Sequence, residues 1–297
     1  MNTSLGFVGL GMMGSPMAAR LIKGGNVLSI YNRTKEKGKE LIAQGARWCD
    51  SPNSVAGASD IVFSIVSNSE SLTDISLGDE GILRGLRKGS IHVDMSTVSP
   101  ATTEKLSREY EKIGCTFLHS PVLGSVPQAT DGSLLLFVGG NEEAFKRAEP
   151  ALKLLGSRIW RFDRPEQASH AKLLCNLFIA GMGTTLAQAL VYAQKADVDP
   201  ETLLDILNNS SLNAPMYQTK GKSILERNFA PRFFVELMLK DIKLILKSSE
   251  DLGVPLPTIE VAQRLFSEAV KSGFGREDYS AVVKVVEQLA GVEVKKR

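Results

Sequence analysis

The pattern of hydrophobic and polar positions divides the chain into two parts. In the first half, short apolar runs alternate with segments whose apolar residues recur at helical spacing. The runs typical of strands are residues 5–9, 27–31, 61–66 and 91–95, and the helix-like segments are 12–23, 35–44 and 100–113. This alternation predicts a doubly wound α/β domain, with parallel strands joined by right-handed helical crossovers.

After Arg161 the pattern changes. From Ala168 onward the segments are long and helical, one of them covering 234–252, and strand signals are few. Prolines separate these segments, at positions 200, 215, 231, 255 and 257. We therefore predict a boundary near 162–167, with an α/β domain at 1–163 and an all-α domain at 164–297.

One of the helical segments, residues 173–194, contains no charged residue and is flanked by Lys172 and Lys195. Its length is close to the roughly 20 residues that cross a bilayer. It also contains polar residues and several glycines, so we interpret it as a buried helix rather than a membrane span. One small helical domain rarely hides so much apolar surface. We therefore expect a second subunit to cover part of it, in a homodimer or homotetramer.

Composition narrows the classes of partner. The 297 residues are 43% hydrophobic and 23% charged, as in globular proteins, and the net charge is only +2. We therefore expect neither nucleic acid nor a membrane surface as a partner. Three cysteines and three histidines at wide spacing favour neither a disulfide framework nor a metal site, and they fit a reducing cytoplasm. The first residues have no basic start and no long apolar run, so we expect no secretory signal.

A glycine pattern follows the first predicted strand. Gly9 would permit a tight turn, Gly11 would let a pyrophosphate approach the backbone, and Gly14 would let the next helix pack close to the strand. An ordinary glycine-rich turn is the alternative, but the position at the start of a βαβ unit favours a Rossmann-type dinucleotide site. The predicted cofactor-binding residues of this loop are Gly9, Leu10, Gly11, Met12, Met13 and Gly14.

The end of the second predicted strand indicates which dinucleotide binds. NAD usually requires an acidic residue there, whereas this chain has Asn32, Arg33 and Thr34. A guanidinium and a hydroxyl suit a 2′-phosphate, and no carboxylate repels it. We predict NADP(H), with Arg33 stacking on the adenine or pairing with the phosphate. The alternative is that Arg33 is only a surface cation at a helix start.

Lys172 and Asn176 lie four residues apart, hence on one face of a helix. Beside a cleft, such a lysine can donate a proton to a carbonyl oxygen, and the asparagine can hold the lysine or the substrate. A lysine that reaches back to water at a helix end is the alternative. His170 could act as the acid instead, although we favour a polar residue near a helix start. The pair Lys240-Asp241 is of a kind usually found on surfaces.

Taken together, these residues resemble the β-hydroxyacid dehydrogenases. This group includes 3-hydroxyisobutyrate dehydrogenase, tartronate semialdehyde reductase and the glyoxylate/succinic semialdehyde reductases, and the pattern is most similar to the last of these. The resemblance covers essentially the whole chain, with motifs in order at 9–14, 94–100, 121–125, Lys172 with Asn176, and Lys240-Asp241. It implies NADPH-dependent interconversion of a small aldehyde, semialdehyde or glyoxylate-like, and its hydroxy acid, with the substrate between the two domains.

The resemblance also assigns roles to residues. Lys172 matches the catalytic lysine, and Asn176 matches an asparagine that helps to bind substrate. The further cofactor contacts that it implies are Asn68, although Ser67 replaces the usual preceding proline, Thr97 on the nicotinamide side, and Lys240 with Asp241 as its support. The residues that it implies around the substrate are Ser96, Leu123, Gly124, Ser125, Phe233 (or Phe234) and Asp241.

Leu123 is a departure from the family pattern, which has serine at this position. Loss of a hydroxyl that binds a substrate carboxylate costs about 1.5–3 kcal/mol. We therefore expect a less polar or differently oriented aldehyde, still met by backbone N–H groups of Gly124 and Ser125.

Two alternatives to this enzyme remain: a non-catalytic NADP-binding scaffold and an imine reductase. Retention of both Lys172 and Asn176 argues against the scaffold. Imine reductases that resemble this family usually replace the lysine, which argues against the second alternative.

Overall fold

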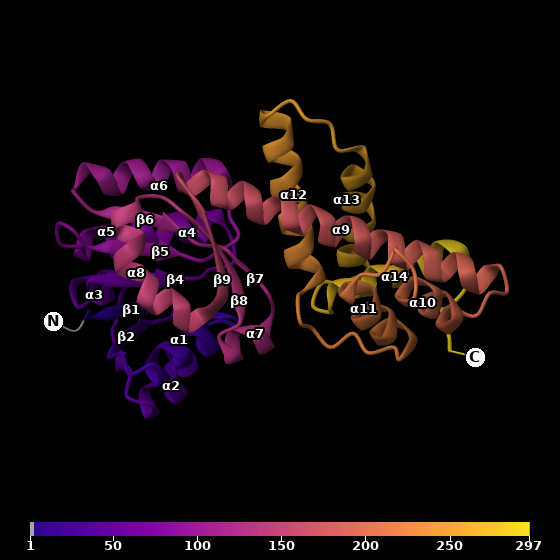
Figure 1. Ribbon diagram of the computed structural model, residues 1–297, viewed down its shortest axis with the longest axis horizontal. Coiled ribbons are helices and arrows are strands. Elements are labelled where there is room, and N and C mark those ends of the chain that lie inside the picture. Colours follow the sequence, from indigo (N-terminus) through magenta and orange to yellow (C-terminus); the bar gives the residue numbers. More distant parts are fainter. Residues whose placement is uncertain (1–2, 297) are drawn as a thin grey trace. The chain divides into compact units, whose positions relative to one another are not determined.

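The computed structural model describes residues 3–296 and consists of two compact units that meet in sequence at Leu173 and Leu174 (Figure 1). Each unit is described by itself.

The first unit is built on one sheet, which has nine strands within the described residues 3–296. The strands are β1 (Leu5–Val8), β2 (Leu28–Tyr31), β3 (Arg47–Trp48), β4 (Ile61–Ser64), β5 (Ile91–Asp94), β6 (Thr116–His119), β7 (Val122–Leu123), β8 (Leu134–Gly139) and β9 (Gly156–Phe162). Their order is β3-β2-β1-β4-β5-β6-β8-β7, and β9 also pairs with β8. This is the Rossmann-type doubly wound sheet that the sequence predicts.

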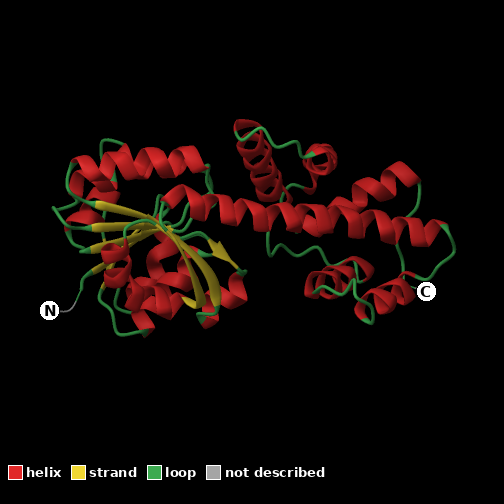
Figure 2. Ribbon diagram, turned by 45° about the horizontal axis from the view of Figure 1, so that its top comes forward, coloured by secondary structure: helices red, strands yellow, loops and turns green. Residues whose placement is uncertain are grey.

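Helices cover both faces of this sheet (Figure 2). They are α1 (Gly14–Lys23), α2 (Lys39–Ala43), preceded by the 3₁₀ turn η1 (Lys35–Gly38), α3 (Pro52–Gly57), α4 (Ser69–Leu77), α5 (Ile82–Gly85), α6 (Pro100–Lys112), α7 (Val126–Asp131) and α8 (Glu142–Leu155). Alternate strand residues supply two separate cores. Phe7 and Phe63 join the core with α1 and α8, and Val8 and Val62 join the core with α3 to α6.

One edge of the sheet differs from the parallel arrangement that the sequence pattern predicts. Strand β8 is antiparallel to both β6 and β7. Strand β7 has only two residues, and β8 is an unbroken apolar run, so neither carries a periodic signal that reveals strand direction.

The order of strands reverses between β1 and β4, because the chain first extends the sheet through β2 and β3 and then returns to pair β4 with β1. At the carboxyl ends of these strands, the Ile65 N–H donates to the Val8 carbonyl at 3.0 Å, and the Gly9 N–H donates to the Tyr31 carbonyl at 3.0 Å. Ligands of open α/β sheets bind outside such a reversal point, which here is bordered by the glycine loop.

The second unit is helical. Its elements are the greater part of α9 (Pro165–Lys195), then α10 (Pro200–Asn208), α11 (Pro215–Leu225), α12 (Val235–Asp251), α13 (Pro257–Ala269), a π-turn η2 (Val270–Phe274), a 3₁₀ turn η3 (Tyr279–Ala281) and α14 (Val282–Ala290). Prolines occupy the first position of α10, α11 and α13, where the missing N–H has no helical partner to lose. Three of the five prolines that separate segments in the sequence therefore mark helix starts, whereas Pro231 and Pro255 lie in the loops before α12 and α13.

Helix α9 belongs to both units. The division by contacts falls at Leu173, after the predicted boundary at 163/164, because the first turns of α9 pack with the first unit. Ser169 on α9, for example, lies 3.1 Å from Thr103 of α6, hydroxyl to hydroxyl.

By length and composition α9 could cross a membrane, and 44% of its most apolar window is buried inside the structure. Ala180, Ala187 and Leu190 are fully buried. We interpret α9 as the central helix of the second unit.

Candidate active site

The glycine loop has the shape that a dinucleotide requires. Gly9 has a φ of +98°, and a Cβ atom there would lie 2.2 Å from the Ile65 carbonyl oxygen. A Cβ atom on Gly14 would lie 1.9 Å from the Gly9 carbonyl oxygen. At Gly11 a Cβ atom would meet no heavy atom of the described residues within 4 Å. The fold itself therefore requires Gly9 and Gly14, whereas Gly11 borders open space, which leaves its backbone accessible to a ligand such as a pyrophosphate.

Asn32, at the end of β2, braces this loop. Its carbonyl oxygen accepts the Leu10 N–H at 2.9 Å, and its amide donates to the Thr34 carbonyl at 2.9 Å. Both functional groups of Asn32 are thus engaged within the protein. The side chains of Arg33 and Thr34, which follow it, are exposed.

The loop after β4 carries the candidate cofactor residue Asn68. The Asn68 side chain caps α4 by accepting the Ser71 N–H at 2.7 Å. The Ser69 hydroxyl accepts the Ser99 N–H at 3.0 Å, which joins this loop to the loop after β5. Thr97 is half-buried in that second loop.

A fully buried carboxylate, Asp94 at the end of β5, supports both loops. It accepts hydrogen bonds from the Ser64 hydroxyl at 2.7 Å and the Ser96 hydroxyl at 2.8 Å, and His119 Nδ1 lies 3.2 Å away. The Ser96 hydroxyl in turn accepts the Val66 N–H at 2.8 Å. Ser96 is therefore engaged inside the protein, and its predicted contact with substrate stays a prediction. The sequence analysis includes Asp94 as the first residue of the motif at 94–100 but assigns it no role, since a carboxylate that ends an apolar strand does not by itself show what it supports.

Asp94 and two groups near it have pKa values that differ from their ordinary ones. Burial lowers the pKa of His92 from 6.5 to about 4, and its two ring nitrogens lie 2.8 Å from the Ser64 hydroxyl and 2.7 Å from the Tyr110 hydroxyl. Burial raises the pKa of Tyr110. Burial alone would raise the pKa of Asp94, but hydrogen bonding and the nearby His119 lower it overall. At neutral pH the network thus contains an ionised Asp94 with a neutral His92 and Tyr110.

The candidate substrate residues Leu123, Gly124 and Ser125 follow β7. Leu123 is half-buried and pairs with Leu135 of β8. Gly124 has a φ of +142°, and a Cβ atom there would lie 2.7 Å from a Leu134 methyl group. The expectation that Ser125 offers its backbone N–H to a substrate stays a prediction, because this N–H is engaged within the protein. That N–H donates to Gln128 Oε1 at 2.9 Å, as part of the capping box of α7.

Lys172 and Asn176 lie one turn apart on α9 and are buried, at 8% and 1% exposure. Asn176 Nδ2 donates to Asp241 Oδ2 at 2.6 Å, and Lys240 Nζ lies 2.8 Å from Asp241 Oδ1. Because Asp241 is only 1% exposed, its pair with Lys240 is not an ordinary surface pair. Within residues 3–296, Asn176 Oδ1 has no hydrogen-bond partner, so a buried acceptor remains for a ligand.

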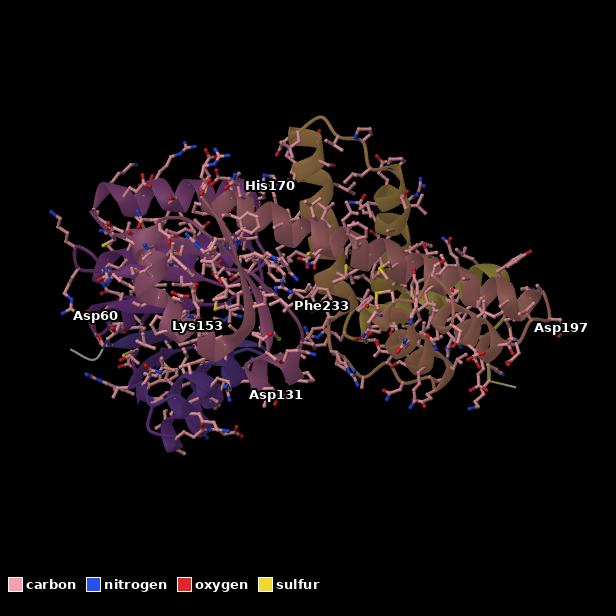
Figure 3. The ribbon with its side chains drawn as sticks, viewed as in Figure 1. Asp60, Asp131, Lys153, His170, Asp197 and Phe233 are labelled. Atoms are coloured by element: carbon pink, nitrogen blue, oxygen red, sulfur yellow. The ribbon has the colours of Figure 1, made fainter. Side chains whose placement is uncertain are left out.

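The other candidate acid, His170, lies near the start of α9 (Figure 3). Burial lowers its pKa, and the opposing effect of Glu166 is smaller. Its imidazole is therefore neutral near pH 7, which makes it a weaker proton donor than an ammonium group.

Phe233, the candidate wall of a substrate pocket, precedes α12 (Figure 3). Its ring packs edge-on against Tyr279, with 6.2 Å between ring centroids. The neighbouring Phe234 lies under the Arg276 guanidinium, 4.7 Å from the ring centroid. The two rings thus have separate partners.

Comparison with protein families divides the chain much as its pattern does. Residues 4–162 match the family model described as the NAD binding domain of 6-phosphogluconate dehydrogenase. Residues 167–286 match the model described as NAD-binding of NADP-dependent 3-hydroxyisobutyrate dehydrogenase.

Three similar proteins are oxidoreductases that the chain matches over most of their length. The chain is 35% identical over 294 residues to 2-(hydroxymethyl)glutarate dehydrogenase of Eubacterium barkeri, covering 99% of this chain and 98% of that one. It is 32% identical over 285 residues to the chloroplastic glyoxylate/succinic semialdehyde reductase 2 of Arabidopsis thaliana, covering 96% and 80%. The crystal structure of 3-hydroxyisobutyrate dehydrogenase from Salmonella typhimurium aligns with a TM-score of 0.87 at 26% identity, covering 96% and 100%. The chain therefore belongs to the β-hydroxyacid dehydrogenase family of oxidoreductases, which bind a nicotinamide cofactor.

Proposed function

We propose that this protein is an NADPH-dependent reductase that interconverts a small aldehyde and its hydroxy acid, with Lys172 as the acid and base. One observation carries the proposal. Lys172 is a buried amine on α9, one turn before an asparagine whose amide is fixed by a buried carboxylate.

A nicotinamide cofactor, when bound, would supply the hydride that reduces the carbonyl carbon. The Lys172 ammonium then donates a proton to the carbonyl oxygen and stabilises the negative charge that develops there. In the direction of oxidation, the neutral amine accepts the proton of the substrate hydroxyl. A lysine suits both directions because its amino group can donate a proton as an ammonium ion and accept one as a neutral amine.

Asn176 supports this step through its carbonyl oxygen. Its Nδ2 group is committed to Asp241 at 2.6 Å, which fixes the orientation of the amide. The buried Oδ1 atom can then accept a hydrogen bond from a hydroxyl of the substrate or from the Lys172 ammonium, which lies one turn away on the same helix. This contact would hold the reacting oxygen in place.

The preference for NADP over NAD is supported by the exposed Arg33 and Thr34 beside the braced glycine loop. Arg33 would pair with the 2′-phosphate or stack on the adenine. Lys240, held by Asp241, would contact the cofactor as the family resemblance implies.

For the substrate we propose a semialdehyde or a glyoxylate-like aldehyde, the class that names the Arabidopsis relative. Leu123 supplies apolar surface where the family pattern has a serine hydroxyl. This favours aldehydes that bind without a hydrogen bond from that hydroxyl to a carboxylate.

We also propose that the protein works as a homodimer or homotetramer. On α9, Leu174, Phe178 and Tyr192 are 59%, 65% and 76% exposed. Phe178 also lines a groove with Met182, Tyr217 and Leu256. Covering these side chains with a second copy would remove apolar surface from water. Light scattering that shows a stable monomer at micromolar concentration would exclude this arrangement.

The experiment that tests the activity follows NADPH oxidation in the presence of glyoxylate, succinic semialdehyde and further short aldehydes, with NADH assayed in parallel. We expect turnover with at least one aldehyde and a higher kcat/KM with NADPH than with NADH. The absence of turnover with every aldehyde, from protein that binds NADPH, would instead favour a non-catalytic cofactor-binding protein.

A further inference from the structure

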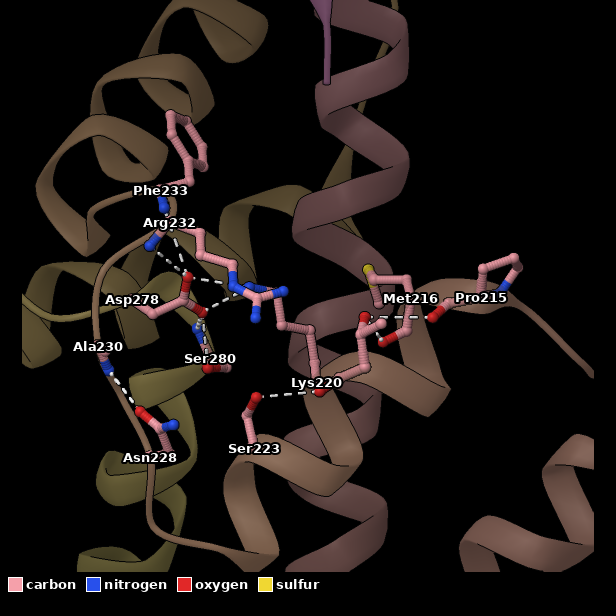
Figure 4. A network of polar contacts seen from close by, with 11 residues as sticks. Pro215, Met216, Lys220, Ser223, Asn228, Ala230, Arg232, Phe233, Asp278 and Ser280 are labelled. Atoms are coloured by element: carbon pink, nitrogen blue, oxygen red, sulfur yellow. Dashed lines mark hydrogen bonds and ion pairs between the residues drawn. The ribbon is translucent and has the colours of Figure 1, made fainter. Parts of the chain in front are cut away.

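A second buried carboxylate, Asp278, lies beneath the segment that carries Phe233 (Figure 4). Asp278 is 3% exposed and immediately precedes the turn η3. One of its oxygens, Oδ2, accepts the backbone N–H groups of Arg232 at 3.2 Å and Phe233 at 3.4 Å. The other oxygen, Oδ1, accepts the N–H of Ser280 at 3.1 Å and its hydroxyl at 2.7 Å.

Lys220 of α11 neutralises this carboxylate. Its Nζ atom lies 2.8 Å from Asp278 Oδ1 and 2.9 Å from Oδ2, and its side chain is only 14% exposed. The same ammonium lies 4.5 Å from the centroid of the Tyr279 ring. A buried ion pair contributes little net stability compared with apolar residues of similar size. Its value here is that it defines where the backbone donors of Arg232 and Phe233 must lie.

The backbone around Asp278 also fixes the same segment. The Asp278 N–H donates to the Phe229 carbonyl at 3.0 Å, and the Tyr279 N–H donates to the Phe233 carbonyl at 2.8 Å. The segment 229–233 has no regular secondary structure, so these bonds and the Asp278 carboxylate determine its course.

Phe233 is held from two sides as a result. Its N–H donates to Asp278, its carbonyl accepts from Tyr279, and its ring packs against the Tyr279 ring. A shift of the Asp278 carboxylate would move the Phe233 backbone, and with it the ring.

We propose that Asp278, together with Lys220, is a positioning residue that sets where Phe233 stands and so which aldehydes the enzyme accepts. This inference rests on the proposed function and on the family resemblance, which implies that Phe233 lines the substrate pocket. In this proposal Asp278 acts through Phe233 rather than by touching the reacting atoms or the cofactor.

The first test variant is Asp278→Asn, which keeps the size of the side chain. In the wild type both oxygens of Asp278 accept hydrogen bonds from N–H or O–H groups. The NH₂ group of asparagine is a donor, so on either side it would face another donor and lose those hydrogen bonds. A milder second variant, Lys220→Gln, removes the cation and leaves the carboxylate in place. The matched control is Glu287→Gln, which removes another buried carboxylate that pairs with Arg227, at 2.6 and 3.2 Å, and accepts the Val294 N–H.

Two measurements separate positioning from stability. Hydrogen exchange should become faster at the amides of Arg232 and Phe233 in Asp278→Asn, and to a smaller degree in Lys220→Gln, but not in Glu287→Gln. In steady-state kinetics, KM for the aldehyde should rise by about tenfold, as expected for one lost hydrogen bond. The ratio of kcat/KM between short and longer aldehydes should change, whereas KM for NADPH should stay within about twofold, a change too small to correspond to a lost contact.

The proposal is overturned if Asp278→Asn and Lys220→Gln lower the thermal stability, as the control does, but change neither the aldehyde ratio nor the exchange of these two amides. A wild-type protein that is inactive on every aldehyde would instead refute the proposed function. In that event unchanged exchange in both variants would still overturn the positioning role, and faster exchange would still support it.

Discussion

The Asn176 amide donates to the Asp241 carboxylate at 2.6 Å, and both residues are 1% exposed. This bond joins α9 to α12 and orients the amide so that its oxygen remains as an acceptor. Since Lys240 pairs with the other oxygen of the same carboxylate, Asp241 holds a candidate substrate residue and a candidate cofactor residue at once. A buried carboxylate between two such donors thus supports both candidate residues.

Replacement of this carboxylate tests that arrangement. Asp241→Ala leaves the Asn176 amide and Lys240 without their partner, so kcat/KM should fall by about 10- to 100-fold, the cost of losing hydrogen bonds to a charged group. The Kd of NADPH should rise as well. Asp251→Ala is the control, because Asp251 lies on the same helix and pairs with Lys247 on the surface. Equal activity in the two variants would contradict a supporting role for Asp241.

Arg33 should determine the choice of cofactor. Arg33→Ala removes the charge available to a 2′-phosphate, so KM for NADPH should rise by about 10- to 100-fold while KM for NADH changes little. Lys146→Ala, which removes an exposed cation paired with Glu142, serves as the control. If NADPH and NADH are affected alike, Arg33 does not bind the phosphate.

Leu123 should limit the use of small carboxylate substrates. Leu123→Ser adds a hydroxyl donor and removes apolar bulk, so kcat/KM for glyoxylate should rise by about tenfold or more. Leu123→Ala provides the space without the hydroxyl and should show a smaller gain. Comparable gains in both variants would mean that bulk, not the hydrogen bond, decides the preference.

His92 should make the stability of the protein depend on pH. The folded protein keeps His92 neutral down to about pH 4, whereas the unfolded chain binds a proton at this residue below about pH 6.5. Between these pH values the unfolded state binds more protons, so the free energy of unfolding should fall as the pH falls, by about 3 kcal/mol in total from this residue.

The variant His92→Gln tests this linkage, because glutamine can bond to Ser64 and Tyr110 but does not titrate. Urea unfolding at pH 7.0, 5.5 and 4.5 should show a smaller loss of stability for the variant than for the wild type over about this range. Parallel losses in the two proteins would assign the pH dependence to other groups.

Much of the fold could be predicted because its signals are local. The spacing of Gly9, Gly11 and Gly14 indicates both the tight turn and the open side of the loop, and the helical pattern at 234–252 differs from α12 by one residue at each end. The charge-free run at 173–194 marked only part of α9, which begins at Pro165, because charged residues interrupt its first turns. Strands β6 to β9 lack a period that distinguishes their pairing from other arrangements.

The buried carboxylates Asp94 and Asp278 and their partners could not be predicted, because the partners are not neighbours in the sequence. Asp278 and Lys220 are 58 positions apart in the sequence, and His119 and Asp94 lie on the neighbouring strands β6 and β5. No spacing in the sequence therefore indicates that these residues are partners. A lone Asp or His in a sequence has many possible roles. Only the fold shows that these carboxylates are buried and accept from several donors.

Lys172 carries the central claim, and the most direct measurement compares Lys172→Ala with wild type and with Lys195→Ala, which removes an exposed lysine at the other end of α9. For each protein, the Kd of NADPH is measured by fluorescence titration and the rate of hydride transfer by single-turnover absorbance with a saturating aldehyde. The account predicts a normal Kd and a rate reduced about 10²- to 10⁴-fold in Lys172→Ala only. A Lys172→Ala protein that binds NADPH normally and reduces the aldehyde at the wild-type rate would contradict it.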